Sequence, residues 1–333
     1  MNNSQLKYNF VSVSGYGWTG SSACIDILKE FKGIDALNGE FRIAKDPYGL
    51  IDLEEALVYN WDFMRHDVAI RDFINYCEMM SRGTGLFKRA GKDFSRKLHI
   101  DFMEETSLYI DKLVKMRYYG DTFIHRYKIP AYKNFIKKVR SKMGKENAVS
   151  MYLSRPSEDF FIKETKNYIN RLFSKYAECE NLNTIVLDQA IPTTNINKAV
   201  RYFDEIKLII IDRDPRDIYA NSVRGNRLLG PELIKNDSSK TYITWHKMLR
   251  KKSQYDISDK NVLRLYFEDF IFKYDESIDR ITKFLDIDYC HNQKGKYFKP
   301  SDSIKNVGLW KKYKNQAAMS EIYDELESYC YKE

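Results

Sequence analysis

Apolar residues alternate or run together in several short segments, and this pattern predicts β-strands. Residues 8–14 alternate between apolar and polar side chains and are rich in β-forming types. Similar segments follow at 184–188, 206–212 and 261–266. The run at 206–212 is continuously apolar, which is typical of a strand buried on both faces.

Segments with helical spacing follow these strands. Apolar residues recur with that spacing over 21–31, 195–203, 215–223 and 277–285, and Pro215 stands where proline favours a first helical turn. Strands that alternate with helices predict an α/β fold, a parallel sheet flanked by helices that starts with a P-loop-like strand–glycine loop–helix. Ligands bind such sheets at their carboxyl edge, so candidate ligand-binding residues are expected at the strand ends.

The segment 50–180 departs from this alternation because its pattern is mainly helical. Within it, residues 132–142 carry Phe135, Ile136 and Val139 on one side and lysines and arginines on the other. We interpret the basic side as a solvated surface. We therefore expect one α/β domain over residues 1–333, in which 50–180 is a mostly helical insertion.

Composition narrows the class of protein. The 333 residues include 55 Lys and Arg against 47 Asp and Glu, a net charge of +8, which suits either an anionic partner or a solubilising surface. The uncharged run 8–25 is too rich in Ser, Gly, Thr and Asn to span a membrane. Five scattered cysteines without a CxxC pair predict neither a disulfide framework nor a metal cluster. We expect a cytoplasmic chain with no secretory signal and no integral membrane segment.

A glycine-rich turn follows the first strand. Gly15-x-x-x-x-Gly20-Ser21-Ser22 has the spacing of a phosphate-binding loop, in which main-chain N–H groups and the positive end of the next helix hold an anion. Ser21 stands where such loops carry the lysine that reaches the β- and γ-phosphates, so hydrolysis of a nucleoside triphosphate is disfavoured. A glycine turn without a ligand is the plain alternative.

A dinucleotide fingerprint is a second alternative for the same loop. Gly15-x-Gly17-x-x-Gly20 fits its spacing, but the sequence predicts no following strand that ends in an acidic residue. Glu40 lies about twenty residues further on, the usual distance, and keeps this alternative open.

A second candidate anion site follows strand 206–212. Arg213 stands at the carboxyl end of the strand, and Asn221 and Ser222 lie about two helical turns further on. A guanidinium with an amide or hydroxyl forms a good phosphate clamp. The alternative is that Arg213 and Asp217 form structural ion pairs at the helix start.

Four segments in one order define a resemblance. They are the glycine loop, Arg213-Asp-Pro-Arg-Asp217 after a strand, Tyr266-Phe-Glu-Asp-Phe270 after a later strand, and Gly308-Leu-Trp-Lys311 near the C-terminus. In type and order they resemble the sulfotransferases that depend on 3′-phosphoadenosine-5′-phosphosulfate (PAPS). The segment 50–180 carries no matching motif.

The resemblance implies transfer of a sulfuryl group from PAPS to a hydroxyl, with a carbohydrate as the candidate acceptor. It implies that the loop grips the 5′-phosphosulfate, that Arg213 with Asn221 or Ser222 holds the 3′-phosphate, and that Lys305 reaches the same phosphate. Trp245 is a candidate for stacking near the adenine, with a core position on an amphipathic helix as the equal alternative. The implied residues for PAPS binding are Gly17, Trp18, Thr19, Gly20, Ser21, Ser22, Arg213, Asn221, Ser222 and Lys305.

The catalytic residues are less directly marked. Trp18 stands where the family carries a catalytic Lys or Arg, and loss of such a contact typically costs on the order of a hundredfold in rate. Arg42, with Lys45, is our candidate substitute. As general base we consider Glu40, in a polar loop after the first βα unit, and Asp188, at the end of a strand. Each carboxylate can equally have a surface or capping role.

Two other functions stay open. One is a P-loop kinase or NTPase-like enzyme, and the other is a nucleotide-binding sulfotransferase homologue without turnover. Dispersed basic residues without an aromatic RNA-binding signature argue against nucleic acid. The expected partners are PAPS and a hydroxyl-bearing acceptor, whose site the insertion 50–180 would shape, and no metal is implied.

Overall fold

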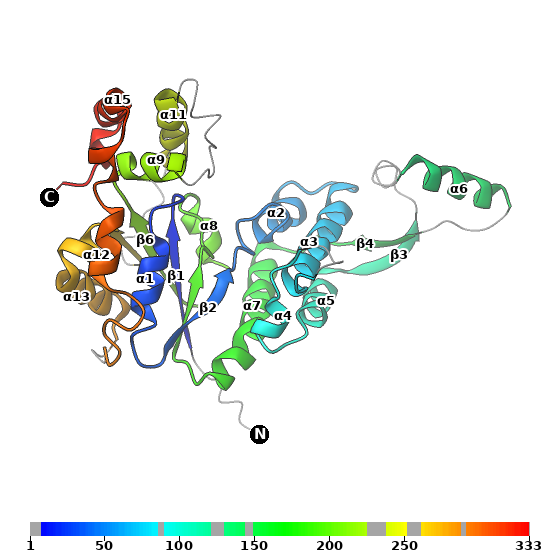
Figure 1. Ribbon diagram of the computed structural model, residues 1–333. Helices are drawn as coiled ribbons and strands as arrows, with labels where there is room; N and C mark the ends of the chain where they lie inside the picture. The colour runs from blue at the N-terminus through cyan, green and yellow to red at the C-terminus, as the bar shows by residue number, and fades with distance from the viewer. Residues whose placement is uncertain are drawn as a thin grey trace. The chain divides into compact units, whose positions relative to one another are not determined.

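A computed structural model describes residues 8–85, 90–120, 130–143, 149–224, 238–251, 261–287 and 291–332. The chain divides into two compact units (Figure 1), which are Met1–Arg42 with Ala177–Glu333, and Ile43–Tyr176. In the described part of the chain no helix is both long and apolar enough to cross a membrane.

The first unit is built on a five-stranded parallel sheet of order β2-β5-β1-β6-β7. The strands are β1 Asn9–Gly15, β2 Ile34–Glu40, β5 Thr184–Asp188, β6 Ile206–Asp212 and β7 Val262–Tyr266. The predicted α/β class is confirmed, and the strands 184–188 and 206–212 have their predicted bounds. The sequence pattern did not predict β2, because this edge strand ends in Asn38-Gly39-Glu40, residue types that are depleted in strands.

Helices cover the sheet and bury alternate residues of its strands. Val11 and Val13 of β1 face an apolar cluster formed with α1, α12 and α13, whereas Phe10 packs edge-on against Phe203, beyond α8. The bounds are α1 Ser21–Leu28, α8 Ile196–Val200, α12 Asp269–Phe272 and α13 Tyr274–Leu285. The predicted helices 21–31 and 195–203 are therefore shorter than their patterns suggest.

A separate apolar cluster joins α9 Pro215–Arg224, α11 Ser238–Arg250 and α15 Gln316–Leu326 (Figure 1). Tyr242 and Met319 lie in its buried centre, and Trp18, Trp245 and Trp310 pack against it. The short segments before α15 are α14 Pro300–Ser303 and the 3-10 turns Ile304–Asn306 and Leu309–Lys312, and another, Glu327–Tyr329, follows it.

The second unit is mostly helical, as its pattern predicts. Its helices are α2 Leu50–Glu54, the π-helix Glu55–Tyr59, α3 Arg65–Ser81, α4 Phe94–Lys97, α5 Phe102–Leu113, α6 Ala131–Lys142 and α7 Glu158–Cys179, which runs on into the first unit. The rings of Tyr109 and Tyr168 stack in its core with their centroids 4.5 Å apart. Among the described residues of this unit, the exception to the helical pattern is an antiparallel ribbon of β3 Met116–Gly120 and β4 Val149–Leu153.

Candidate functional site

The glycine loop joins β1 to α1 at the carboxyl edge of the sheet. Gly17, Trp18 and Gly20 have φ angles of 91°, 53° and 88°, a left-handed conformation that favours glycine. A Cβ at Gly20 would lie 2.5 Å from the ring of Phe267, so this position also needs the absence of a side chain. Gly20 caps α1 without a side-chain hydrogen bond, which leaves the start of the helix suited to an anion.

Arg213 connects this loop to a distant part of the chain. Its Nη1 donates to the carbonyl oxygen of Trp18 at 3.2 Å, and its Nη2 donates to the carbonyl of Asn306 at 2.5 Å. The guanidinium also lies over the ring of Phe267, 5.2 Å from its centroid. Arg213 is only 4% exposed, and its buried Nε has no hydrogen-bond partner among the described residues. A buried donor of this kind is a candidate for a bound anion.

A second buried arginine, which the sequence pattern does not predict, supports the loop. Arg250 of α11 forms a bidentate pair with Asp212, with both N···O distances at 2.6 Å. Its guanidinium stacks 3.6 Å from the ring centroid of Tyr16 in the glycine loop. No local motif marks Arg250, because it ends an ordinary amphipathic helix and meets its partners only in the fold.

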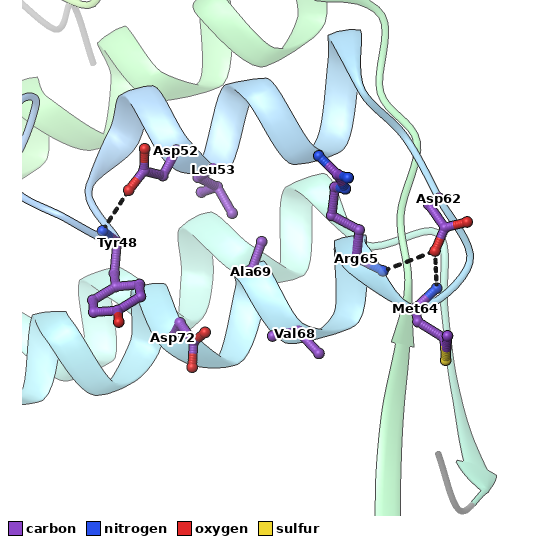
Figure 2. A pocket seen from close by; sticks show the side chains of 9 residues that line it. All are labelled: Tyr48, Asp52, Leu53, Asp62, Met64, Arg65, Val68, Ala69 and Asp72. Atoms are coloured by element: carbon purple, nitrogen blue, oxygen red, sulfur yellow. Dashed lines mark hydrogen bonds between the residues drawn. The ribbon is translucent and has the colours of Figure 1, made fainter. Parts of the chain in front are cut away.

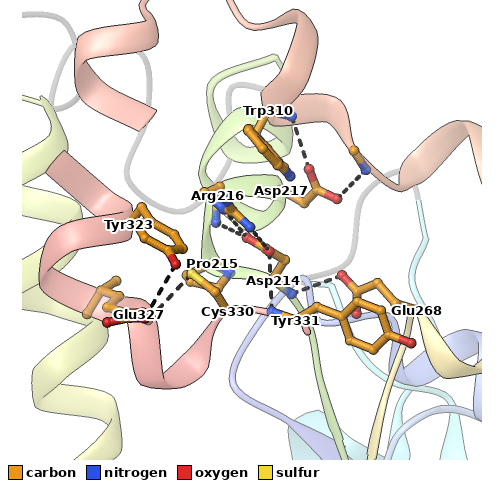
Figure 3. A network of polar contacts seen from close by, with 12 residues as sticks. Asp214, Pro215, Arg216, Asp217, Glu268, Trp310, Tyr323, Glu327, Cys330 and Tyr331 are labelled. Carbon is orange, nitrogen blue, oxygen red and sulfur yellow. Dashed lines mark hydrogen bonds and ion pairs between the residues drawn. The ribbon is translucent and has the colours of Figure 1, made fainter. Parts of the chain in front are cut away.

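The segment after Arg213 anchors the Gly308-Leu-Trp310 segment (Figure 3). The Asp217 carboxylate accepts the main-chain N–H groups of Gly308 at 2.7 Å and Trp310 at 3.0 Å. Arg216 pairs with Asp214 at 2.6 Å and stacks over the Trp310 ring at 3.8 Å. Two of the four segments that carry the family resemblance are therefore joined by direct contacts.

Glu268, from the segment 266–270, completes this network. Its Oε1 accepts the N–H of Asp214 at 3.0 Å, while its buried Oε2 has no hydrogen-bond partner in the described part of the chain. Burial raises the pKa of Glu268 to about 8, because the neighbouring N–H and Arg213 stabilise the carboxylate less than burial destabilises it. Through its hydrogen bond to the N–H of Asp214, the Glu268 side chain holds the turn that follows Arg213.

The remaining residues expected to hold the 3′-phosphate differ in what their side chains can donate. Ser222 is buried, and its Oγ donates to the carbonyl of Ile218 at 2.7 Å within α9. Asn221 is half-buried on the same helix. Lys305 is exposed and precedes Asn306, whose carbonyl binds Arg213. The fold thus places the segment of Lys305 beside Arg213.

The three predicted catalytic residues lie at the carboxyl ends of neighbouring strands. Glu40 and Asp188 are paired in register at the ends of β2 and β5, and Nη1 of Arg42 lies 3.6 Å from Oε2 of Glu40. Beside them, Gln189 reaches Oγ of Ser21 over a long 3.5 Å contact.

The structure corrects our placement of Glu40, which ends a strand rather than lying in a loop. The expectation that no following strand ends in an acidic residue was therefore wrong. The dinucleotide alternative does not gain from this, because the dinucleotide fold places its second strand beside the first, whereas here β5 lies between β2 and β1.

Trp245 borders the glycine loop. Its ring lies 3.9 Å from the place that a Cβ on Gly17 would occupy. The same side chain lines an open hollow of about 440 Å³ on α11, together with Lys240, Thr241, Thr244 and Met248. The position suits an aromatic platform near the loop.

The helical unit carries a cavity of its own, of about 400 Å³ (Figure 2). Apolar side chains of α2 and α3 form one part of its wall, and charged side chains and a tyrosine form the rest. Asp62 accepts the N–H of Met64 at 2.9 Å, and Asp52 accepts that of Tyr48 at 2.7 Å. The lining residues are Tyr48, Asp52, Leu53, Asp62, Met64, Arg65, Val68, Ala69 and Asp72.

A parallel α/β sheet with a glycine loop before α1 and a buried arginine after β6 is an architecture that suits a phosphate-bearing ligand. The model of the sulfotransferase family matches residues 94–291, more than half of the chain. The chain belongs to the sulfotransferase family, and the suspected family membership is confirmed. The match includes Arg213 and the segment 266–270 and begins after the glycine loop.

Solved structures, two sulfotransferases among them, are similar to this chain at low sequence identity. The sulfotransferase domain of the Synechococcus PCC 7002 olefin synthase is 11% identical with a TM-score of 0.46, over 98% of this chain and 96% of that one. A sulfotransferase from Mycobacterium avium is 11% identical with a TM-score of 0.41, over 96% and 76%. Retinol dehydratase in complex with androsterone and the inactive cofactor PAP is 13% identical with a TM-score of 0.33, over 96% and 80%. No curated protein matches the chain in sequence.

Proposed function

We propose that this chain transfers a sulfuryl group from PAPS to a hydroxyl group of an acceptor. The observation that carries the proposal is the position of Arg213, a buried guanidinium that binds the glycine loop through Trp18 and the segment of Lys305 through Asn306. A nucleotide with phosphates at both its 3′ and 5′ positions needs two anion sites held together in this way.

The residues present fit such a nucleotide. The loop 15–22 offers left-handed glycines and an uncapped helix start for the 5′-phosphosulfate. Arg213, whose Nε is buried without a protein partner in the described chain, would hold the 3′-phosphate with Asn221 and Lys305. We favour Asn221 over Ser222, because the Ser222 hydroxyl already donates to Ile218. Trp245 would stack near the adenine.

The contacts at the ends of β2 and β5 support the catalytic roles that we propose. When bound, PAPS supplies an activated sulfuryl group. Since Glu40 faces Arg42 in an ion pair, we propose that Glu40 orients this cation and that Asp188 takes the proton of the acceptor hydroxyl. Arg42 would supply the positive charge that Trp18 cannot.

One observation favours a second candidate function, a nucleotide-binding homologue without turnover. The Trp18 ring packs against the cluster of α9, α11 and α15 at the position where the family carries its catalytic cation. Such a protein would keep the nucleotide site and bind PAPS without transferring its sulfate.

For the acceptor we propose a carbohydrate, recognised by the helical unit. Its cavity combines the ring of Tyr48 with carboxylates and Arg65, groups that stack on sugar faces and hydrogen-bond to hydroxyls. Ala69→Trp, which fills this cavity, should raise KM for the acceptor and leave the KM for PAPS unchanged.

The experiment is sulfate transfer from radiolabelled PAPS to a panel of glycans and simple alcohols. The proposal expects a labelled product with at least one glycan, and a loss of about a hundredfold in kcat for Asp188→Asn. Glu40→Gln should lose less. Nucleotide binding without a product on any acceptor would instead establish the homologue without turnover.

A further inference from the structure

Helix α6, residues 131–142, has an apolar stripe that no described part of the protein buries. In other amphipathic helices of the chain, such as α13, the apolar residues Ile278 and Ile281 are fully buried in the core. In α6 the corresponding side chains are exposed, Phe135 to 68% and Tyr132 to 62%. The helix follows β3 and precedes β4 in the chain (Figure 1).

The stripe is regular. At about 100° per residue, its members fall within an arc of about 100° on the helix surface. They are Tyr132, Phe135, Ile136, Val139 and, directly after the helix, Met143. An exposed apolar stripe of this kind needs an apolar partner.

Cations flank the stripe on both sides. Lys133, Lys137 and Arg140 lie along one border and Lys138 and Lys142 along the other, as the same helical geometry shows. Residues 131–143 contain no acidic side chain. Lysine and arginine at these borders can bury their stems beside the stripe and keep their charges at a polar surface.

We propose that α6 lies in the surface of a membrane that contains anionic phospholipid, with its apolar stripe among the acyl chains and its cations at the headgroups. This combination of one narrow apolar face with basic residues along both of its borders and no acidic residue is typical of interfacial helices. The helix has 12 residues, too few to span a bilayer. The inference does not depend on the proposed function.

The charges of α6 favour an anionic membrane over two other partners, a second copy of the helix and a nucleic acid. In a symmetric pair of α6 helices from two copies, the basic borders would face each other and repel. A nucleic acid would satisfy the cations but leave Phe135 and Ile136 in water. An anionic lipid surface satisfies both sets of side chains.

The test is sedimentation of the full chain with phosphatidylcholine vesicles, with and without phosphatidylserine. We expect binding only to the vesicles with phosphatidylserine, and weaker binding at high salt. Lys133→Glu/Lys138→Glu and Phe135→Gln/Ile136→Gln should each reduce this binding by about tenfold or more. Because these side chains are exposed, both variants should keep the thermal unfolding midpoint of the wild type.

The matched control is Lys163→Glu/Lys175→Glu, which makes the same change of charge at exposed positions on α7 and should keep full binding. The proposal is overturned if the wild type stays in solution with phosphatidylserine vesicles, or if the control loses as much binding as the α6 charge variant. The proposal is also overturned if the Phe135→Gln/Ile136→Gln variant keeps full vesicle binding. The same holds if the only effect of this variant is to convert a dimer of the chain to a monomer.

Discussion

Arg213 donates a hydrogen bond to the main-chain carbonyl of Trp18 over 3.2 Å, although 195 positions separate the two residues in sequence. The contact ties the end of β6 to the glycine loop that follows β1. The same guanidinium binds Asn306 near the C-terminus. Three segments of the predicted nucleotide site therefore depend on one side chain.

Replacing Arg213 should separate these segments and remove a charge from the anion site. For Arg213→Ala we expect the affinity for adenosine 3′,5′-bisphosphate to fall by about tenfold or more, since a charge-assisted hydrogen bond contributes about 1.5–3 kcal/mol. Calorimetric titration measures this loss. Arg213→Lys keeps the charge but not the bidentate geometry, so its affinity for the bisphosphate should lie between those of the wild type and Arg213→Ala. Unchanged affinity in a folded Arg213→Ala variant would remove Arg213 from the site.

Asn221 and Ser222 offer a comparison on one helix. Asn221→Ala should weaken binding of the bisphosphate several-fold, because a half-buried amide can donate to the 3′-phosphate. Ser222→Ala should leave binding nearly unchanged and cost about 1 kcal/mol of stability at most, since its hydroxyl donates to Ile218. Titration and chemical unfolding of both variants check this. The reverse order of effects on binding would assign the phosphate contact to Ser222.

The two left-handed glycines of the loop should respond differently to alanine. Gly17→Ala and Gly20→Ala both place an L-residue at positive φ, which costs roughly 1–2 kcal/mol. Only Gly20→Ala also drives a Cβ to 2.5 Å from Phe267, whereas at Gly17 the nearest atom is 3.9 Å away. Gly20→Ala should therefore lose about 1–3 kcal/mol more in urea unfolding. Equal losses in the two variants would contradict the close packing of the loop on Phe267.

Glu268 should make stability depend on pH. Its pKa is about 8 in the folded chain, against about 4.3 in an unfolded one, so the folded state holds the proton more tightly. The contribution of this protonated carboxyl to the stability of the folded chain is fully present below about pH 4, and it is lost as pH rises through about 8. In thermal unfolding between these limits, Glu268→Gln should lose less stability than the wild type as pH rises.

An exposed carboxylate provides the control for Glu268. Glu180→Gln makes the same substitution at an exposed position and should keep the pH dependence of the wild type. If Glu268→Gln and the wild type instead lose stability in parallel between pH 5 and 8, the Glu268 carboxyl is not protonated in the folded chain.

Much of the sheet could be predicted from the sequence, because continuous apolar runs indicate buried strands such as 206–212. The edge strand β2 could not, since its exposed end carries Asn38 and Gly39. The relation of Arg213 to strand β6 followed from its place after an apolar run. Its bonds to Trp18 and Asn306 did not, because they join segments that only the fold brings together. The contact between Arg250 and the ring of Tyr16 could not be predicted for the same reason.

The central claim is that the site joined by Arg213 holds a nucleotide with phosphates at its 3′ and 5′ positions. Its most direct test is calorimetric titration of the full chain with adenosine 3′,5′-bisphosphate and, separately, with ATP and magnesium. We expect the bisphosphate to bind at least about tenfold more tightly than ATP, and Arg213→Ala to abolish this preference. Tight binding of ATP with magnesium and none of the bisphosphate would contradict it.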